Sequence, residues 1–391
     1  MLFAVREKTR DNYSLSMDQF QKDMHGHTKD IAAQVARLSQ LLTRHRDELP
    51  LVYLQDPALR EAYISYFLPS NIKKIHIPLH ELALHPAGLL SQDRLRILDI
   101  GCGPGSALLG VMEFFSQHEH RPFLELTALD HVPENLTATK TFCESWCSQW
   151  NINATITTVK ENILQKNFSP AGAFDLILFS NVVNELFVSD ENRTRKRAAL
   201  VSRIVKDCLH AQGSCIIIEP ALHQTSRDML SLRDAMQEQG VQIYAPCLVQ
   251  RFCPALANPK DWCHEDVPWE PPKLVQEIDR LTGLRKDSLK FSYLVLRKDS
   301  HALSDVCTQD AFRIVSEPLV SKGKIEYYIC GNSGRRLVTR LNKDRTTANA
   351  SFATLKRGDI AAFEQLTDQQ KRYIVGKQTS VRILIQRKSY A

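Results

Sequence analysis

Three cysteines in one short segment are the residues of this chain best suited to metal chemistry. Cys247, Cys253 and Cys263 lie in a Pro- and Trp-containing loop of residues 245–270. Loose spacing of this kind suits an iron-sulfur cluster, because its thiolates can come from loops set wide apart. Zinc is the alternative, since His264 follows Cys263 directly and three cysteines with one histidine form a common structural zinc site. Three buried and inert thiols would give the same pattern.

A glycine-rich loop is the second segment whose residues could bind a ligand. Asp99 is followed by Gly101, Gly103 and Gly105, after an apolar run of strand length and before a helix-like stretch. Glycines allow a strand-to-helix turn to adopt backbone angles closed to other residues, and they let the main chain approach a ligand closely. Asp130 ends the next apolar run, where a carboxylate can accept hydrogen bonds from ribose hydroxyls. Together these residues predict a nucleotide-binding pocket.

The spacing of these glycines is similar to the first motif of class I S-adenosylmethionine methyltransferases. That resemblance implies an S-adenosylmethionine site formed by Asp99, the three glycines, Asp130 and Asn162. In it the glycines approach the methionine end of the cofactor and Asp130 takes the ribose. Asn162 lies near the adenine.

No catalytic residue can be assigned from the sequence. The loops that follow the predicted fourth and fifth strands contain no cysteine that could add to a pyrimidine ring. Asn181, Asn184 and Glu185 are the polar candidates there, and Glu185 has the chemistry of a general base. Polar residues that begin a helix would look the same. Binding of a methyl donor is therefore better supported than methyl transfer, and enzymatic activity stays open.

The surrounding sequence predicts the elements that position these residues. Residues 1–90 have apolar residues at helical spacing, including Ile31, Val35 and Leu38. Residues 91–300 alternate short apolar runs with helix-like segments, which predicts an α/β Rossmann-like parallel sheet covered on both faces. Regular structure is expected to stop in the proline-rich loop between Pro246 and Pro272. Residues 301–391 show short alternating runs with glycine-containing turns, typical of a small β-barrel.

Charge is unevenly distributed along the 391 residues. Residues 311–391 carry 16 Lys and Arg against 6 Asp and Glu, a net of +10 within a chain of net +6. This excess predicts that the C-terminal region binds a polyanion, with RNA as the natural candidate. A solvated basic face is the simpler alternative. No apolar stretch approaches the length of a membrane span, and residues 1–30 lack the pattern of a signal or transit peptide. We therefore expect no membrane partner and a bacterial cytoplasmic location, with the mitochondrial matrix as the alternative.

Several motifs occur in an order that resembles one family. They include the glycine loop, Asn184-Glu185-Leu186, Ala245-Pro246-Cys247 and the Trp-Cys-His that ends at His264. The chain resembles the methyltransferase-like assembly factors of the small ribosomal subunit, which occur in mitochondria and bacteria. The resemblance implies a methyltransferase-like fold, an S-adenosylmethionine pocket, a four-iron four-sulfur cluster and binding to small-subunit ribosomal RNA during assembly.

The same resemblance supplies a fourth cluster ligand, Cys330, in the basic C-terminal region. A cluster held by Cys247, Cys253, Cys263 and Cys330 would staple this region to the methyltransferase-like domain, so loss of the cluster is expected to free it. Two functions follow from the sequence. One is an assembly factor that binds rRNA, and the other is an active S-adenosylmethionine-dependent rRNA methyltransferase.

Overall fold

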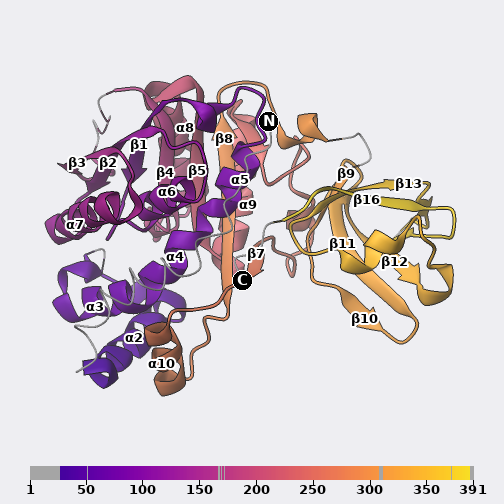
Figure 1. The fold of residues 1–391 in the computed structure, drawn as a ribbon, viewed down its shortest axis with the longest axis horizontal. Helices are drawn as coiled ribbons and strands as arrows, with labels where there is room; N and C mark the ends of the chain where they lie inside the picture. The colour runs from indigo at the N-terminus through magenta and orange to yellow at the C-terminus, as the bar shows by residue number, and fades with distance from the viewer. Residues whose placement is uncertain are drawn as a thin grey trace.

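The structure is a computed structural model that describes residues 27–50, 52–165, 168, 170, 172–307, 311–370 and 372–387. The first 26 residues of the predicted helical region lie outside this set. A larger part contains the first sheet and most of the helices, and a smaller part contains a second sheet formed by the C-terminal residues (Figure 1). The boundaries predicted at residues 90 and 300 stay predictions.

The first sheet has the strand order β3-β2-β1-β4-β5-β8-β6, with β7 paired to β8. Strands β1 to β5 are parallel, whereas β8 runs antiparallel to both β5 and β6. A parallel sheet with one reversed strand inserted near its end is the class I methyltransferase-like arrangement, so the predicted fold class is confirmed. The strands are β1 (Arg94–Ile100), β2 (Phe123–Asp130), β3 (Ala154–Lys160), β4 (Phe174–Ser180), β5 (Leu209–Pro220), β6 (Gln242–Ala245), β7 (Glu265–Pro268) and β8 (Ser288–Arg297).

Helices cover both faces of this sheet. In β1, Leu95 and Ile97 belong to the core shared with α6 and α7, whereas Leu98 and Ile100 belong to the core shared with α8 and α9. Side chains of a strand alternate between the two faces, and a strand buried on both faces is therefore apolar throughout. The covering helices are α6 (Ser106–Ser116), α7 (Pro133–Trp150), α8 (Arg193–Cys208) and α9 (His223–Glu238).

The predicted N-terminal helical region forms a cap beside the sheet (Figure 1). Ile31, Val35 and Leu38 are buried, as their spacing predicts. The cap contacts α10 through α2 and contacts α6 through α4. Its elements are α2 (Thr28–Thr43), α3 (Pro57–Ala62), the π-helical turn η4 (Tyr63–Phe67), α4 (Leu68–Lys74) and α5 (His76–Leu82), with short 3-10 turns η2 (Arg46–Glu48), η3 (Tyr53–Gln55) and η5 (Leu89–Ser91); α10 is Lys273–Thr282.

The C-terminal residues form a second sheet of eight strands in the order β14-β15-β12-β11-β9-β13-β16, with β10 paired to β11. Within the described residues, β14 and β16 end this path and do not pair with each other. The predicted barrel-like domain is therefore a curled sheet that does not close into a barrel. The strands are β9 (Ala311–Ile314), β10 (Leu319–Ser321), β11 (Lys324–Gly331), β12 (Gly334–Leu341), β13 (Ile360–Glu364), β14 (Thr367–Asp368), β15 (Arg372–Ile374) and β16 (Ser380–Ile385), with 3-10 turns η8 (Leu303–Val306), η9 (Asn342–Asp344) and η10 (Ala350–Thr354).

The cysteine-rich loop is more regular than the sequence predicted. Strand β7 and the 3-10 turn η7 (Pro254–Ala257) both lie between Pro246 and Pro272, where regular structure was expected to stop. Strand β7 forms because β8 is long enough to pair with it beyond the end of β5, from Phe291 to Ser288. Within the described part of the chain, no helix has both the length and the apolar character needed to cross a membrane.

Buried charges join the second sheet to the rest of the molecule. Arg313 on β9 pairs with Glu81 on α5 at 2.7 Å, and Glu81 also accepts a hydrogen bond from the Tyr293 hydroxyl at 2.7 Å. Arg387 pairs with Glu265 of β7. Each of these four charged side chains is less than a tenth exposed. Buried pairs of this kind hold two surfaces in one relative position, because separating them would leave charges without partners.

Candidate functional site

A pocket of about 370 Å³ lies at the carboxyl ends of the parallel strands. Ligands of open α/β sheets bind outside this edge, so the location is the one expected for a nucleotide. Gly101, Gly103, Asp130 and Asn162 all line the pocket. Asp99 and Gly105, the two other predicted cofactor residues, are not among its lining residues and lie at the base of the same loop.

The glycine loop is shaped by steric limits at two of its glycines. Gly101 has φ of +68° and Gly105 has φ of +88°, both in the left-handed region. A Cβ atom at Gly101 would come within 2.5 Å of Val182 Cγ2, and one at Gly105 within 2.8 Å of Thr139 Cγ2. At Gly103 no atom lies within 4 Å of the Cβ position, so that side of the loop stays open for close approach of a ligand.

Asp130 ties the end of β2 to the glycine loop. Its Oδ2 accepts a hydrogen bond from Gly103 N at 2.9 Å, and its Oδ1 accepts one from Val132 N at 2.8 Å. Asn135 Nδ2 also donates to Oδ1, at 3.4 Å. A carboxylate has about four acceptor sites, so these three bonds leave capacity for a ribose hydroxyl. Asn162 Oδ1 accepts from Leu164 N at 2.9 Å within its own turn, which leaves its side-chain NH₂ group as the donor toward the pocket.

Asp99 is fully buried beneath this loop. Within the described residues, neither of its carboxylate oxygens has a hydrogen-bond partner. Burial, followed by the nearby charge of Asp130, raises the pKa of Asp99 to about 8. Its carboxyl group is therefore largely protonated at neutral pH, and a ligand in the pocket does not meet it as a charge.

The loop after β4 brings its three polar residues to the same pocket. The main chain of Asn184 makes two hydrogen bonds: its N donates to Glu219 Oε1 at 3.2 Å, and its carbonyl accepts from Arg197 Nη2 at 2.8 Å. Its side chain also bonds Glu219 and Arg46. These contacts make Asn184 a structural residue. Burial raises the pKa of Glu185 to about 7, partly offset by Arg46, so Glu185 can exchange a proton near neutral pH.

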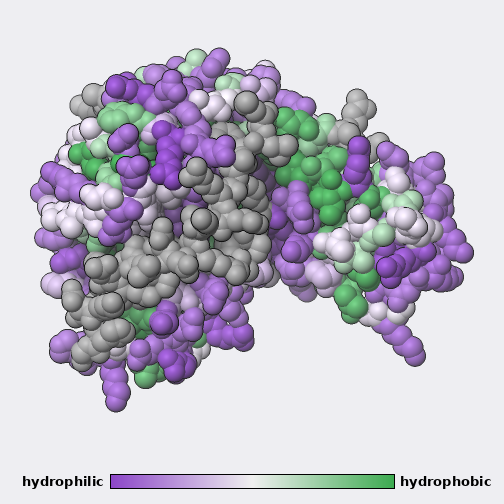
Figure 2. Space-filling view, in the orientation of Figure 1, coloured by the Kyte–Doolittle hydropathy of each residue, from purple (hydrophilic) through white to green (hydrophobic). Residues whose placement is uncertain are grey.

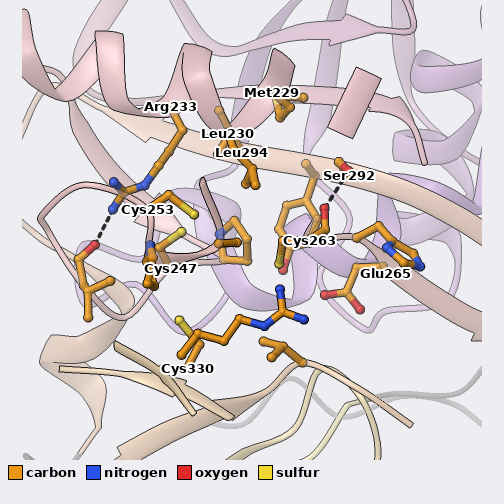
Figure 3. Close-up of a pocket in the computed structure, with 18 residues that line it drawn as sticks. Met229, Leu230, Arg233, Cys247, Cys253, Cys263, Glu265, Ser292, Leu294 and Cys330 are labelled. Carbon is orange, nitrogen blue, oxygen red and sulfur yellow. Dashed lines mark hydrogen bonds between the residues drawn. The ribbon is translucent and has the colours of Figure 1, made fainter. Parts of the chain in front are cut away.

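The four predicted cysteines meet at a second cavity of about 60 Å³. Cys247 follows β6, Cys253 caps η7, Cys263 precedes β7, and Cys330 lies on β11 of the second sheet. Figure 3 shows Cys247 and Cys253 together on one side of the cavity, Cys263 on the other, and Cys330 approaching from the second sheet. The fold thus unites residues that are up to 83 positions apart in the chain, counting from Cys247 to Cys330.

Arg233 of α9 braces the loop that carries Cys247 and Cys253. Its guanidinium donates to the carbonyl of Val249 at 2.5 Å, bonds the carbonyl of Arg251, and pairs with Asp234 at 2.6 Å. Asp234 in turn accepts from Cys253 N at 3.0 Å. On the opposite side, Ser292 Oγ donates to the carbonyl of Cys263 at 3.0 Å (Figure 3). The cysteine main chains are therefore positioned by bonds that do not involve the thiols.

The thiols themselves do not adopt a closed ligand geometry. Across the residues that the structure describes, no group of three or more His, Cys, Asp or Glu side chains is arranged to hold a metal ion. Burial, with the neighbouring Cys247, raises the pKa of Cys263 to about 11 and that of Cys330 to about 12. Thiols in this state are protonated, and coordination to a metal would deprotonate them. The donor set fits a metal in its chemistry, while His264 at the same cavity keeps the zinc alternative open.

Comparison with known proteins assigns a family. A family model described as mitochondrial small ribosomal subunit Rsm22 matches residues 58–359, more than half of the chain. The chain belongs to the Rsm22 family. The matched range contains the glycine loop and all four cysteines, whereas α2 and strands β13 to β16 lie outside it.

Solved structures similar to this Rsm22-family chain are methyltransferases and related proteins. An O-methyltransferase family protein from Burkholderia thailandensis has 12% identity and a TM-score of 0.32, covering 73% of this chain and 71% of that chain. The fibrillarin pre-rRNA processing protein of Methanococcus jannaschii has 12% identity and a TM-score of 0.29, covering 53% and 67%. No curated protein matches the chain. Both structural likenesses are weak, and the fold assignment rests on the strand order given above.

Sequence reasoning missed the cap side of the nucleotide pocket. Tyr53, Tyr63, Asn71 and Lys74 line it from the helical cap, and Lys286 lines it from the turn after α10. Lys74 gave one usable signal, since it is a lysine inside an apolar helical pattern and is only 7% exposed. Nothing in the sequence around Lys286 indicates that it lines the same pocket as Lys74, more than two hundred positions earlier in the chain.

Proposed function

We propose that this Rsm22-family protein is a small ribosomal subunit assembly factor that binds rRNA and carries an S-adenosylmethionine pocket and a four-iron four-sulfur cluster. The observation that carries the proposal is the meeting of four cysteines, predicted from sequence, at one cavity in a chain of this family. The family is described from the mitochondrial subunit, which favours the mitochondrial matrix over the bacterial cytoplasm.

The nucleotide pocket would hold S-adenosylmethionine along the ends of β1, β2 and β3. In this arrangement Gly101 and Gly103 contact the methionine end, Asp130 accepts from the ribose hydroxyls, and Asn162 lies toward the adenine. Gly105 acts from behind the loop by fixing its shape, and Asp99 lies buried beneath it. The volume of about 370 Å³ falls within the range of small-molecule sites.

Cys247, Cys253, Cys263 and Cys330 would hold the cluster. Four thiolates drawn from separate loops are the usual ligands of a four-iron four-sulfur cluster, and the buried Arg233 and the largely buried Arg335 beside them would offset its negative charge. The cluster's contribution is structural, because it would join β11 of the second sheet to the loops around β6 and β7. Zinc held by the same thiols, or by three of them and His264, is the alternative.

The rRNA surface is proposed on the second sheet. Several of its arginines are already used inside the protein: Arg335 is only 14% exposed and donates to the carbonyl of Trp262, and Arg336 pairs with Asp368 at 2.8 Å. Lys343, Arg345 and Lys377 are exposed, and none of them has a carboxylate partner among the described ion pairs. We call these three residues the basic edge.

The basic edge brings together two loops of the second sheet. The loop after β12 and the loop before β16 are joined by Asn349, which donates to the carbonyl of Gly376 at 3.1 Å, and by Thr346, which donates to that of Lys377 at 3.5 Å. Figure 2 shows that the outer side of the second sheet is mainly hydrophilic, whereas hydrophobic residues gather toward its junction with the larger part. A cluster of unpaired cations on such a face suits the phosphates of RNA.

An active rRNA methyltransferase is the second candidate function. Glu185 favours it, because this residue lines the nucleotide pocket and has a pKa raised to about 7 by burial. Transfer of tritiated methyl groups to small-subunit rRNA, lost in Glu185→Gln but retained in Glu144→Gln, an exposed position on α7 outside the pocket, would establish this function. RNA binding without incorporation of label would leave the assembly-factor proposal standing alone.

Metal analysis of anaerobically purified protein tests the proposal most directly. We expect near-stoichiometric iron and sulfide in the full chain, loss of both in Cys330→Ser, and retention in Cys307→Ser, whose thiol lies outside the cavity. Zinc without iron would replace the cluster by a zinc site. Absence of any metal from protein handled without oxygen would refute the metal centre.

A further inference from the structure

Two lysines line the nucleotide pocket from segments outside the parallel strands. Lys74 comes from the last turn of α4 and Lys286 from the turn that follows α10. Lys74 is 7% exposed, and Lys286 is partly buried. They lie close enough for the charge of Lys286 to act on Lys74: burial and this charge lower the pKa of Lys74 to about 7. Burial also lowers the pKa of Lys286 to about 8.

Both ammonium groups are oriented by contacts that do not neutralise them. Lys74 Nζ donates to Asn71 Oδ1 at 2.7 Å, and Asn71 donates to the Tyr63 hydroxyl at 3.0 Å. Lys286 Nζ lies over the rings of Tyr66 and Phe67, at 5.5 and 5.2 Å from their centres. Cation–π contacts position a cation without supplying an opposite charge.

Neither lysine has a carboxylate within 4.0 Å among the described residues. The nearest acidic candidate on α10, Asp279, is occupied by the Tyr66 hydroxyl at 2.5 Å and by the main-chain N of Lys286 at 2.9 Å. Two neighbouring cations in a largely enclosed space are costly, and an anion between them would remove that cost.

Acidic and basic side chains both line the pocket. Asp130, Glu161 and Glu185 lie at or after the ends of strands, whereas Lys74 and Lys286 come from α4 and the turn after α10, with Arg46 and Lys290 as further cations. S-adenosylmethionine also carries both signs of charge, because its sulfonium and ammonium groups are positive and its carboxylate is negative. A phosphate of bound RNA would meet the same two lysines if it entered from the cap side.

We infer that Lys74 and Lys286 form an anion-binding subsite at the cap end of the nucleotide pocket, which takes a carboxylate or a phosphate. The carboxylate would be that of the methyl donor, and the phosphate would come from RNA. The carboxylate source rests on the proposed function, since it requires S-adenosylmethionine to bind in this pocket. The phosphate source does not depend on it.

Calorimetric binding of two adenosine ligands separates the sources. S-adenosylhomocysteine carries the amino-acid group, whereas 5′-methylthioadenosine lacks it. With a donor carboxylate in the subsite, Lys74→Met weakens S-adenosylhomocysteine binding about tenfold or more, because a charge-assisted hydrogen bond is lost. Binding of 5′-methylthioadenosine stays within about twofold, as the adenosine contacts are unchanged. Lys286→Met repeats the test with the second lysine, and the same weakening of S-adenosylhomocysteine binding is expected.

Lys140→Met is the matched control. Lys140 lies on the exposed side of α7, 3.9 Å from Glu144, and is not among the residues that line the pocket, so its loss should change neither affinity. Thermal unfolding of each variant checks that it is folded.

Inorganic phosphate tests the second source. With a phosphate subsite, phosphate raises the melting temperature of the wild-type protein above that in sodium chloride of equal ionic strength, and the increase disappears in Lys74→Met and Lys286→Met. If both variants bind S-adenosylhomocysteine like the wild type and phosphate gives no specific increase, the subsite is refuted. If the wild-type protein binds neither adenosine ligand, the proposed donor pocket fails, and the phosphate measurement alone decides the subsite.

Discussion

The basic edge gives the sharpest prediction for RNA binding. We consider a triple variant, Lys343→Ala, Arg345→Ala and Lys377→Ala, which removes three exposed cations with no described carboxylate partner. Each cation that neutralises a phosphate releases counterions, so the logarithm of the binding constant falls with the logarithm of salt concentration by about 0.7 per contact on single-stranded nucleic acid. Loss of three contacts should therefore flatten the slope by about 2, and at 0.1 M salt it should weaken binding about a hundredfold.

The assay is a salt titration of binding to a small-subunit rRNA transcript, followed by fluorescence anisotropy. The control variant carries Lys29→Ala, Lys140→Ala and Lys206→Ala, three exposed lysines on helices α2, α7 and α8 of the larger part. It has the same change in net charge but leaves the second sheet intact. If the control flattens the slope as much as the triple variant does, binding depends on total charge, and the basic edge is not the RNA surface.

Three further predictions concern the stability of the fold. Gly101→Ala should destabilise the protein by about 1–3 kcal/mol more than Gly103→Ala, because only the first places a Cβ against a neighbouring side chain; equal urea midpoints would contradict this. Glu81→Gln should cost about 3–5 kcal/mol, since Arg313 would stay buried without its carboxylate; a loss below about 1 kcal/mol in urea unfolding would show that water compensates. The pKa of Asp99 is raised from 3.8 to about 8, so the folded state binds the extra proton and stability falls as pH rises between these values. In Asp99→Asn the free energy of unfolding should therefore fall less steeply with pH, by up to about 1.4 kcal/mol per pH unit. Parallel curves of unfolding free energy for variant and wild type from about pH 5 to 7 would refute this prediction.

Buried elements were predictable from the sequence because their side chains must be apolar on both faces. The apolar runs at residues 95–100, 123–129 and 174–179 predict strands, and β1, β2 and β4 begin and end within one residue of these limits. Strand β3 was missed because it lies at the sheet edge and presents exposed threonines in place of an apolar run. Strand β7 was missed because its four residues, Glu265 to Pro268, form a strand only by pairing with β8.

The two candidate sites differ in what local sequence can reveal. The glycine loop is one continuous segment, so its turn and its ligand-facing side follow from the spacing of Gly101, Gly103 and Gly105. The cysteine cavity is assembled from two sheets, and spacing alone indicated only the three cysteines of the loop. Cys330 required a family resemblance. Arg233 holds the loop by donating to two of its carbonyl groups. The sequence contains no indication of this role, because the two carbonyls belong to residues 16 and 18 positions away, beyond the end of the helix.

The contacts around the cysteine cavity change one expectation about the cluster. The sequence suggested that loss of the cluster would free the C-terminal region. The structure shows two buried ion pairs between the second sheet and the larger part, and Arg357 also donates to the carbonyl of His264 at 3.1 Å. Ala311 and Ile360 of the second sheet belong to the core of the larger part.

These contacts do not use the four thiols, and the Glu81–Arg313 pair lies outside the cysteine cavity, whereas Glu265 lines it. The Glu81–Arg313 and Glu265–Arg387 pairs lie on α5 and β7 of the larger part, so they would persist if Cys330 lost its ligand role. Breaking a buried pair costs about 3–5 kcal/mol, which is comparable to the whole stability of a marginal domain interface. Removal of the cluster should therefore loosen the loop of Cys247 and Cys253 first, because the buried side chains that hold this loop, Arg233 and Asp234, both come from the single helix α9. On this reasoning the cluster orders the loop between the two sheets, and the charged pairs keep the sheets together.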